Sequence, residues 1–95
     1  MTIELTRRTV KDLNQLDPPI RKHTITALQQ LADDPELGHR LIGSLRGARA
    51  LDFSAVDVAY RAAYILYQDR WLVFLIGPHE GFYALAVRRY HTLPR

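Results

Sequence analysis

The spacing of apolar residues changes about halfway along this 95-residue chain, and that change limits the folds open to it. In the first half the apolar positions repeat every three or four residues, which is typical of amphipathic helices. In the second half they come in β-branched and aromatic runs, at residues 58–67 and 71–76, which favour strands. A helical half followed by a strand-rich half predicts an α+β domain, in which helices pack against a sheet.

Two short helices are predicted near the N-terminus, after a short strand at residues 3–5. Thr6 has the residue type of an N-cap for the first helix. Asp17-Pro18-Pro19 ends that helix and starts the next, because aspartate caps a helix and proline suits its first turn. Asp33-Asp34-Pro35 ends the second helix. The two helices form a helical hairpin.

The second half predicts a sheet and one more helix. Residues 36–47 form a connector, strands follow at 48–53, 58–67 and 71–76, and turns lie at 54–57 and 68–70. Residues 71–76 are apolar on both faces, which predicts a central strand. Residues 80–91 return to helical spacing. The predicted fold is α+β with the order β-α-α-β-β-β-α in a single domain, residues 1–95. It has an antiparallel sheet of about four strands, the N-terminal helical hairpin on one face and a short C-terminal helix.

Composition excludes several classes of protein. The chain has no cysteine, which excludes a disulfide scaffold and a thiolate metal site. No apolar run approaches the roughly 20 residues needed to span a bilayer, and the first residues lack the pattern of a secretion leader. We therefore expect a cytoplasmic protein. No phosphate loop, nucleophile elbow or metal-ligand cluster occurs, and we expect no metal, no cofactor and no small-molecule substrate.

Positive charge is concentrated in the second half. Residues 1–45 carry six basic and six acidic side chains, whereas residues 46–95 carry seven arginines, four acids and no lysine. The same half holds all five tyrosines. Arginine binds phosphate through a planar fork, and tyrosine offers a face on which a base can stack. This distribution predicts a polyanionic ligand.

Arg61 is the first candidate functional residue, because it interrupts an apolar strand. An unpaired buried guanidinium is very costly, so Arg61 either pairs with a carboxylate or faces a solvated cavity. Asp52, Asp57 and Asp69 are the possible partners. The pattern alone leaves both readings open.

The turn after the last strand is the second candidate. His79, Glu80 and Tyr83 place an imidazole, a carboxylate and a phenol at one end of the sheet. Imidazole transfers protons near neutral pH. A solvated turn whose aromatic residues close the core is the competing reading. Two basic clusters could bind phosphate or simply face solvent: Arg46 with Arg49, and Arg88 with Arg89.

In this order, these features resemble the RelE/ParE superfamily of bacterial type II toxins. The resemblance extends over nearly the whole chain. The matching segments are the N-terminal strand and helical hairpin, Leu41–Gly47, Ala59–Tyr64, Val73–Gly77, Pro78–Tyr83 and the tail Tyr83–Arg89.

The resemblance implies a toxin that a cognate antitoxin protein holds inactive. In the RelE branch the free toxin cleaves mRNA in the ribosomal A site, with the RNA 2′-hydroxyl as nucleophile and without a metal. Arg61 matches the family arginine that stabilises the charge of the phosphorane. His79 falls where RelE has an arginine implicated as the acid, and imidazolium gives up a proton more readily. Tyr83 matches a tyrosine that stacks on or orients a nucleotide.

The chain departs from RelE in the strand before Arg61. RelE has lysines there that are proposed to activate the 2′-hydroxyl, whereas this chain offers Arg46 and Arg49, and arginine is a poor base. Glu80, Asp57 or neutral His79 could serve, and the sequence does not choose among them. Two alternatives therefore stay open: a ParE-like inhibitor of DNA gyrase, and a non-toxic co-repressor that acts with its antitoxin.

Overall fold

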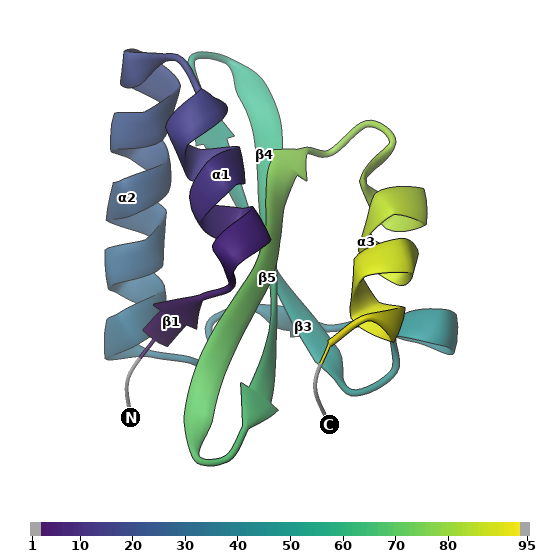
Figure 1. Cartoon of the computed structure of the whole chain (residues 1–95). Helices are drawn as coiled ribbons and strands as arrows, with labels where there is room; N and C mark the ends of the chain where they lie inside the picture. The colour runs from purple at the N-terminus through teal and green to yellow at the C-terminus, as the bar shows by residue number, and fades with distance from the viewer. Residues whose placement is uncertain (1–2, 94–95) are drawn as a thin grey trace.

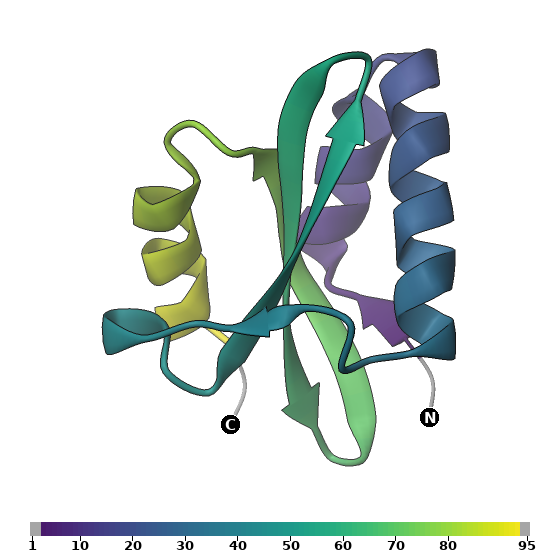
Figure 2. The same cartoon turned by 180° about the vertical axis from the view of Figure 1, so that it is seen from behind.

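Helices cover both faces of one sheet (Figure 1). A computed structural model describes residues 3–93 of the chain. The elements are β1 (Ile3–Leu5), α1 (Arg7–Gln15), α2 (Pro18–Asp33), β2 (His39–Arg40), the 3₁₀ turn η1 (Gly43–Leu45), β3 (Ala48–Ala55), β4 (Val58–Tyr67), β5 (Arg70–Pro78) and α3 (Phe82–His91). Helices α1 and α2 lie on one face of the sheet and α3 lies on the other, as the view from behind also shows (Figure 2).

The sheet has five strands in the order β1-β5-β4-β3-β2. All neighbours are antiparallel except β1, which runs parallel to β5. The α+β class, the helical hairpin and the order of the predicted elements are confirmed. The strand β1 was predicted, but its parallel pairing with β5 was not, because an antiparallel sheet was expected. The sequence also did not predict β2, which has only two residues and so carries no alternating pattern.

Both predicted helix boundaries in the N-terminal half are confirmed. The Thr6 hydroxyl accepts a hydrogen bond from the Thr9 backbone N–H, at 3.2 Å, and so caps α1. Asp17 occupies the N-cap position of α2, although its side chain makes no capping hydrogen bond, and Pro18 opens the helix. No helix within residues 3–93 has the length and apolar content needed to cross a membrane.

The two hairpin turns are tighter than the sequence suggests. The turn predicted at residues 54–57 contains only Val56 and Asp57, whose φ angles are 51° and 62°. Positive φ at both central residues is the geometry of a type I′ turn, which matches the twist of the flanking strands. Because this turn has two residues, Ala55 pairs with Val58, and the same register places Asp52 opposite Arg61.

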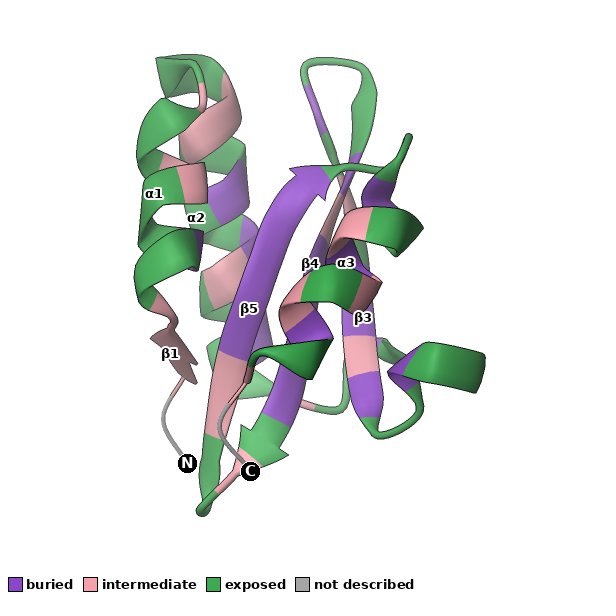
Figure 3. Cartoon of the chain, turned by 45° about the vertical axis from the view of Figure 1, so that its right-hand side comes forward, coloured by how far each residue is buried: buried purple, intermediate pink, exposed green. Residues whose placement is uncertain are grey.

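The sheet divides the core into two apolar clusters. One lies beneath α3 and contains Phe74, Leu75 and Phe82. The other lies beneath the helical hairpin and contains Leu31 and Tyr64. Figure 3 shows that much of β4 and β5 is buried, as expected for strands packed on both faces.

Candidate active site

Arg61 is mostly buried on the sheet and forms an ion pair with the half-exposed Asp52. The Arg61 Nε is 2.5 Å from Asp52 Oδ1, and the two side chains are 18% and 52% exposed. The Arg61 guanidinium carbon also lies 5.7 Å from the centroid of the Phe82 ring, within the range of a cation–π contact. Within residues 3–93 neither Nη of Arg61 has a hydrogen-bond partner. Asp52 is thus the carboxylate partner, one of the three that the sequence offered, and the ion pair uses only the Nε of Arg61.

His39 binds the other oxygen of the same carboxylate. Its Nε2 is 3.1 Å from Asp52 Oδ2, and its side chain is 51% exposed. Partial burial raises the pKa of Asp52, but the hydrogen bond and charge of Arg61, with the charge of His39, outweigh burial and lower that pKa below its ordinary value. The carboxylate is therefore ionised at neutral pH, between a guanidinium and an imidazole.

Tyr64 fixes the segment that leads into His39. Its hydroxyl donates to the Pro35 carbonyl at 2.6 Å and accepts from the Gly38 N–H at 3.1 Å. A Cβ at Gly38 would lie 2.4 Å from the Tyr64 hydroxyl and 2.7 Å from the Ala50 carbonyl, so no other residue fits there without movement. The close approach at Gly38 thus sets the position of β2 and of His39 on it.

His79 directly follows β5 on the exposed end of the sheet. Its backbone N–H donates to the Ala59 carbonyl at 2.9 Å, which extends the β4–β5 pairing by one bond. Gly77 lies opposite Arg61 in that pairing. Since strand side chains alternate between faces, the position two residues on is a diagonal neighbour of Arg61 on the same face, about 7–8 Å between Cα atoms. If the alternation continues past the end of β5, His79 lies on the same face as Arg61, and their joint role in a site stays a prediction.

Tyr83 is exposed on the first turn of α3 and leans toward η1. Its side chain is 54% exposed, and its hydroxyl is 3.4 Å from the site of a Cβ on Gly43. Its neighbour Phe82 contacts Arg61. Within residues 3–93 no hydrogen bond, ion pair or ring contact joins Tyr83 to Arg61 or His79, and its hydroxyl is directed toward Gly43 instead. Glu80 lies exposed in the turn before α3.

Of the other predicted residues, some are exposed to solvent and some are held in structural contacts. Arg46 and Arg88 are exposed. Arg89 instead forms a bidentate ion pair with Asp12 of α1, at 2.5 and 2.8 Å. Arg49 donates to the Gly38 carbonyl at 2.9 Å on the opposite face of the sheet from Arg61.

Asp57 is at the tip of the β3–β4 hairpin. It is four residues from Arg61 along β4, or about 13 Å at the rise of a strand. No group of three or more potential metal-ligating side chains occurs within residues 3–93.

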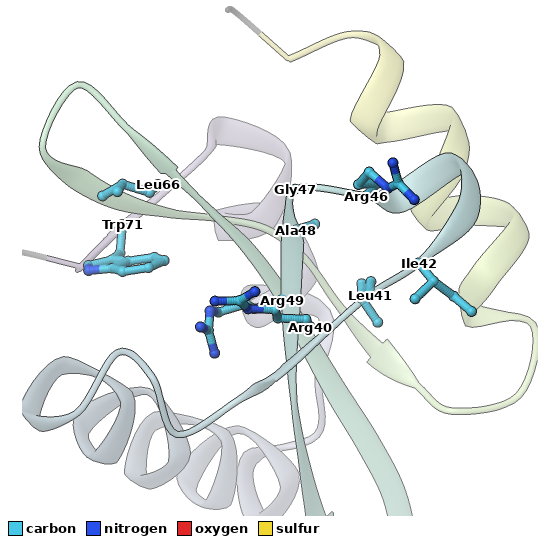
Figure 4. Close-up of a pocket in the computed structure, with 9 residues that line it drawn as sticks. All are labelled: Arg40, Leu41, Ile42, Arg46, Gly47, Ala48, Arg49, Leu66 and Trp71. Carbon is cyan, nitrogen blue, oxygen red and sulfur yellow. The ribbon is translucent and has the colours of Figure 1, made fainter.

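An arginine-lined pocket of about 550 Å³ lies at the other end of the sheet (Figure 4). Arg40 and Arg49, which are directly opposed across β2 and β3, form one part of its wall. Leu66 and Trp71 form another part. The pocket contains none of Arg61, His79 and Tyr83, so the candidate active site is an open surface separate from it.

The residues that sequence reasoning missed are His39 and Asp52 as members of the site. The sequence offered Asp52 only as one of three possible partners for Arg61, and it assigned no role to His39, which is one of four histidines in the chain. A two-residue turn at Val56–Asp57 is the signal that would have placed Asp52 opposite Arg61. Nothing in the sequence pattern predicts the pairing of β2 that brings His39 to them.

The family model for the ParE-like toxin of type II bacterial toxin–antitoxin systems matches residues 3–86. The chain belongs to this family. The toxin also shares its fold with solved RelE structures. A mutant of E. coli RelE in the free state is 16% identical, with 97% of each chain covered and a TM-score of 0.73. No curated protein matches the toxin in sequence.

Two similar structures contain an antitoxin. The RelBE2 toxin–antitoxin complex from Mycobacterium tuberculosis is 21% identical over 82% of the toxin and 96% of that chain, with a TM-score of 0.70. The intact E. coli RelBE complex is 15% identical over 83% of the toxin and 96% of that chain, with a TM-score of 0.66. At these identities the solved structures establish the fold alone, and membership of the family rests on the family model.

Proposed function

We propose that this toxin is an mRNA endoribonuclease that acts in the ribosomal A site and uses the 2′-hydroxyl of the RNA as nucleophile. The observation that carries the proposal is the guanidinium of Arg61, whose two Nη groups have no hydrogen-bond partner within residues 3–93. His79 directly follows β5, the strand next to Arg61, and its backbone N–H donates to the Ala59 carbonyl, which supports a role for both residues at one end of the sheet. Cleavage of this kind needs a cation at the phosphorane and a proton donor for the leaving oxygen.

Each residue of the face has a role in the proposal. Arg61 binds the two non-bridging oxygens of the phosphate and stabilises their charge as the pentavalent phosphorane forms. His79, as imidazolium, protonates the departing 5′-oxygen. Tyr83 is exposed at the border of the face and stacks on a flanking base. Arg46 and Arg88 guide the RNA backbone as exposed cations.

The proposed protein partner is a cognate antitoxin. Similar structures of RelE-type toxins contain one, and the toxin carries an excess of positive charge in residues 46–95. The pocket between Arg40, Arg49 and Trp71 combines charge with apolar side chains. It suits an acidic amphipathic segment of such a partner.

Mapping of mRNA ends tests this function. Wild-type toxin, Arg61→Ala and His79→Ala would be added to translating ribosomes, with Arg8→Ala as a control because Arg8 is an exposed arginine on α1. We expect new mRNA ends with wild type and Arg8→Ala. Each of the two site variants should cleave at least about 100-fold more slowly than wild type, which is the range for loss of a charge-stabilising or proton-transferring group.

A gyrase inhibitor is the second candidate, because residues 46–95 contain no lysine. Double-strand DNA breaks after induction, with transcripts left intact, would replace the ribonuclease with this function. Toxicity that persists unchanged in both Arg61→Ala and His79→Ala would count against the assignment of these two residues.

A further inference from the structure

We propose that His39 is the general base of the cleavage reaction, an assignment that rests on the proposed ribonuclease function. His39 and Arg61 bind the two oxygens of one carboxylate, at 3.1 and 2.5 Å. The imidazole of His39 and the guanidinium of Arg61 therefore lie on either side of one carboxylate group. In the proposal the guanidinium holds the phosphate. A phosphodiester on the free Nη groups of Arg61 brings its 2′-oxygen near the imidazole.

Asp52 determines which imidazole nitrogen is available. An ionised carboxylate only accepts hydrogen bonds, so the Nε2 of His39 must carry the proton in their contact. In the neutral imidazole the lone pair then lies on Nδ1, which points away from Asp52 and is the atom able to accept a proton. Asp52 is thus a positioning residue that fixes the tautomer and the direction of the ring.

The other candidate bases lack this arrangement. Asp57 is at a hairpin tip, about 13 Å along the strand from Arg61. Glu80 is exposed in a turn, and within residues 3–93 no hydrogen bond orients its carboxylate. His79 is needed as the acid. His39 alone combines proximity to Arg61, an orienting carboxylate and exposure to solvent, since 51% of its side chain is accessible.

The local fold also holds His39 in place. Gly38 is fixed by the Tyr64 hydroxyl through its N–H and by Arg49 through its carbonyl, at 3.1 and 2.9 Å. A catalytic side chain requires this kind of support, because a displacement of about 1 Å can cost 100-fold in rate. Arg49, predicted from the sequence as a phosphate ligand, acts here through the position of His39.

The chemical step uses two imidazoles, that of His39 as the base and that of His79 as the acid. The 2′-hydroxyl proton passes to Nδ1 of His39 while the 2′-oxygen forms a bond to phosphorus. The bond between phosphorus and the 5′-oxygen breaks, and the 5′-oxygen takes a proton from His79. The products are a 2′,3′-cyclic phosphate and a free 5′-hydroxyl. His39 ends protonated and His79 neutral, so the pair is reset by exchange with water.

Single-turnover cleavage of ribosome-bound mRNA tests the assignment in the full-length toxin. His39→Ala is compared with His23→Ala, which removes an exposed imidazole from α2. We expect His39→Ala to cleave at least about 100-fold more slowly than wild type, as for loss of a general base. His23→Ala should cleave at the wild-type rate. Added imidazole should restore cleavage by His39→Ala at least tenfold and leave Arg61→Ala unchanged. Circular dichroism and antitoxin binding check that each variant is folded.

The outcomes separate this assignment from the function on which it rests. If wild type cleaves, Arg61→Ala does not, and His39→Ala stays within threefold of wild type, the base is another group and the ribonuclease stands. A slow His39→Ala that imidazole does not rescue assigns the residue a structural role and likewise overturns the assignment. Absence of cleavage by wild type rejects the function itself.

Discussion

Arg89 of α3 and Asp12 of α1 form a bidentate ion pair that closes the edge of β5 beyond the end of β1. The Arg89 Nη1 also donates to the Phe74 carbonyl at 3.2 Å, and Asp12 accepts the Ile76 N–H at 3.2 Å. Both side chains are only 14% exposed. Two helices on opposite faces of the sheet are thus joined through backbone groups that would otherwise be unpaired.

Replacement of Arg89 should therefore destabilise the fold. Arg89→Ala leaves the Asp12 carboxylate without its partner in a mostly buried place, and we expect the free energy of unfolding to fall by about 3 kcal/mol. Arg88→Ala, at the neighbouring exposed position, should change it by less than about 0.5 kcal/mol. Urea denaturation of both variants measures the difference. Equal stability of the two would contradict a structural role for the pair.

Tyr64→Phe should also reduce stability, since it removes one hydroxyl and retains the ring. The Gly38 N–H and the Pro35 carbonyl lose their partner, and an unsatisfied buried group costs about 1–3 kcal/mol. Tyr67→Phe is the matched control, because within residues 3–93 the Tyr67 hydroxyl has no hydrogen bond. Thermal unfolding should show a lower midpoint for Tyr64→Phe alone, and a shared shift would rule out the hydroxyl as the cause.

Burial raises the pKa of Tyr64, and its hydrogen bonds and the nearby Arg49 only partly offset this. The sign of the pH effect follows from the linkage between protonation and folding. The folded state holds the phenol proton more tightly than the unfolded state, so stability falls as the pH rises above about 10, the ordinary tyrosine value. Between pH 9 and 11 the unfolding free energy should fall more steeply in wild type than in Tyr64→Phe. Parallel curves for the two would contradict this.

The sequence was sufficient for the fold because local patterns determine most of it. Thr6 and Pro18 mark helix starts through local chemistry, and apolar periodicity distinguishes helices from strands. The two-residue strand β2 has no such pattern. It exists because Gly38 admits the Tyr64 hydroxyl and the Ala50 carbonyl at close range, which is a contact between distant parts of the chain.

The site was only partly predictable for a related reason. A shift of one residue in strand register moves each side chain to the other face. The turn at 54–57 left the register of β3 undetermined, and hence the faces of Arg49 and Asp52. Arg61 and His79 were proposed as site residues because a charged residue inside an apolar strand, and a histidine just after one, are visible as local anomalies. Arg89 resembled a solvated cation because its partner, Asp12, is 77 residues away.

The ionised Asp52 carboxylate should stabilise the folded protein, and this stabilisation should be lost at acidic pH. Its pKa is lowered in the folded state, so folding favours the ionised form. The contribution is fully present above about pH 4, the ordinary value, and is lost as the pH falls through the lower folded value. Because the side chain is 52% exposed, the loss should stay below about 1 kcal/mol. Urea midpoints from pH 6 to pH 2 should fall further for wild type than for Asp52→Asn, and an identical slope would contradict the shift.

Activity should depend on Asp52 much more than stability does. Asp52→Asn removes the charge that orients both Arg61 and His39, and we expect mRNA cleavage to fall at least tenfold while the unfolding free energy at pH 7 changes by less than about 1 kcal/mol. An amide can donate or accept, so the imidazole tautomer is no longer fixed. Asp52→Glu keeps the carboxylate and should recover part of the rate. Cleavage assays and urea denaturation on the same preparations measure the split. If Asp52→Asn cleaved at the wild-type rate, the carboxylate would be only a surface ion-pair partner of Arg61.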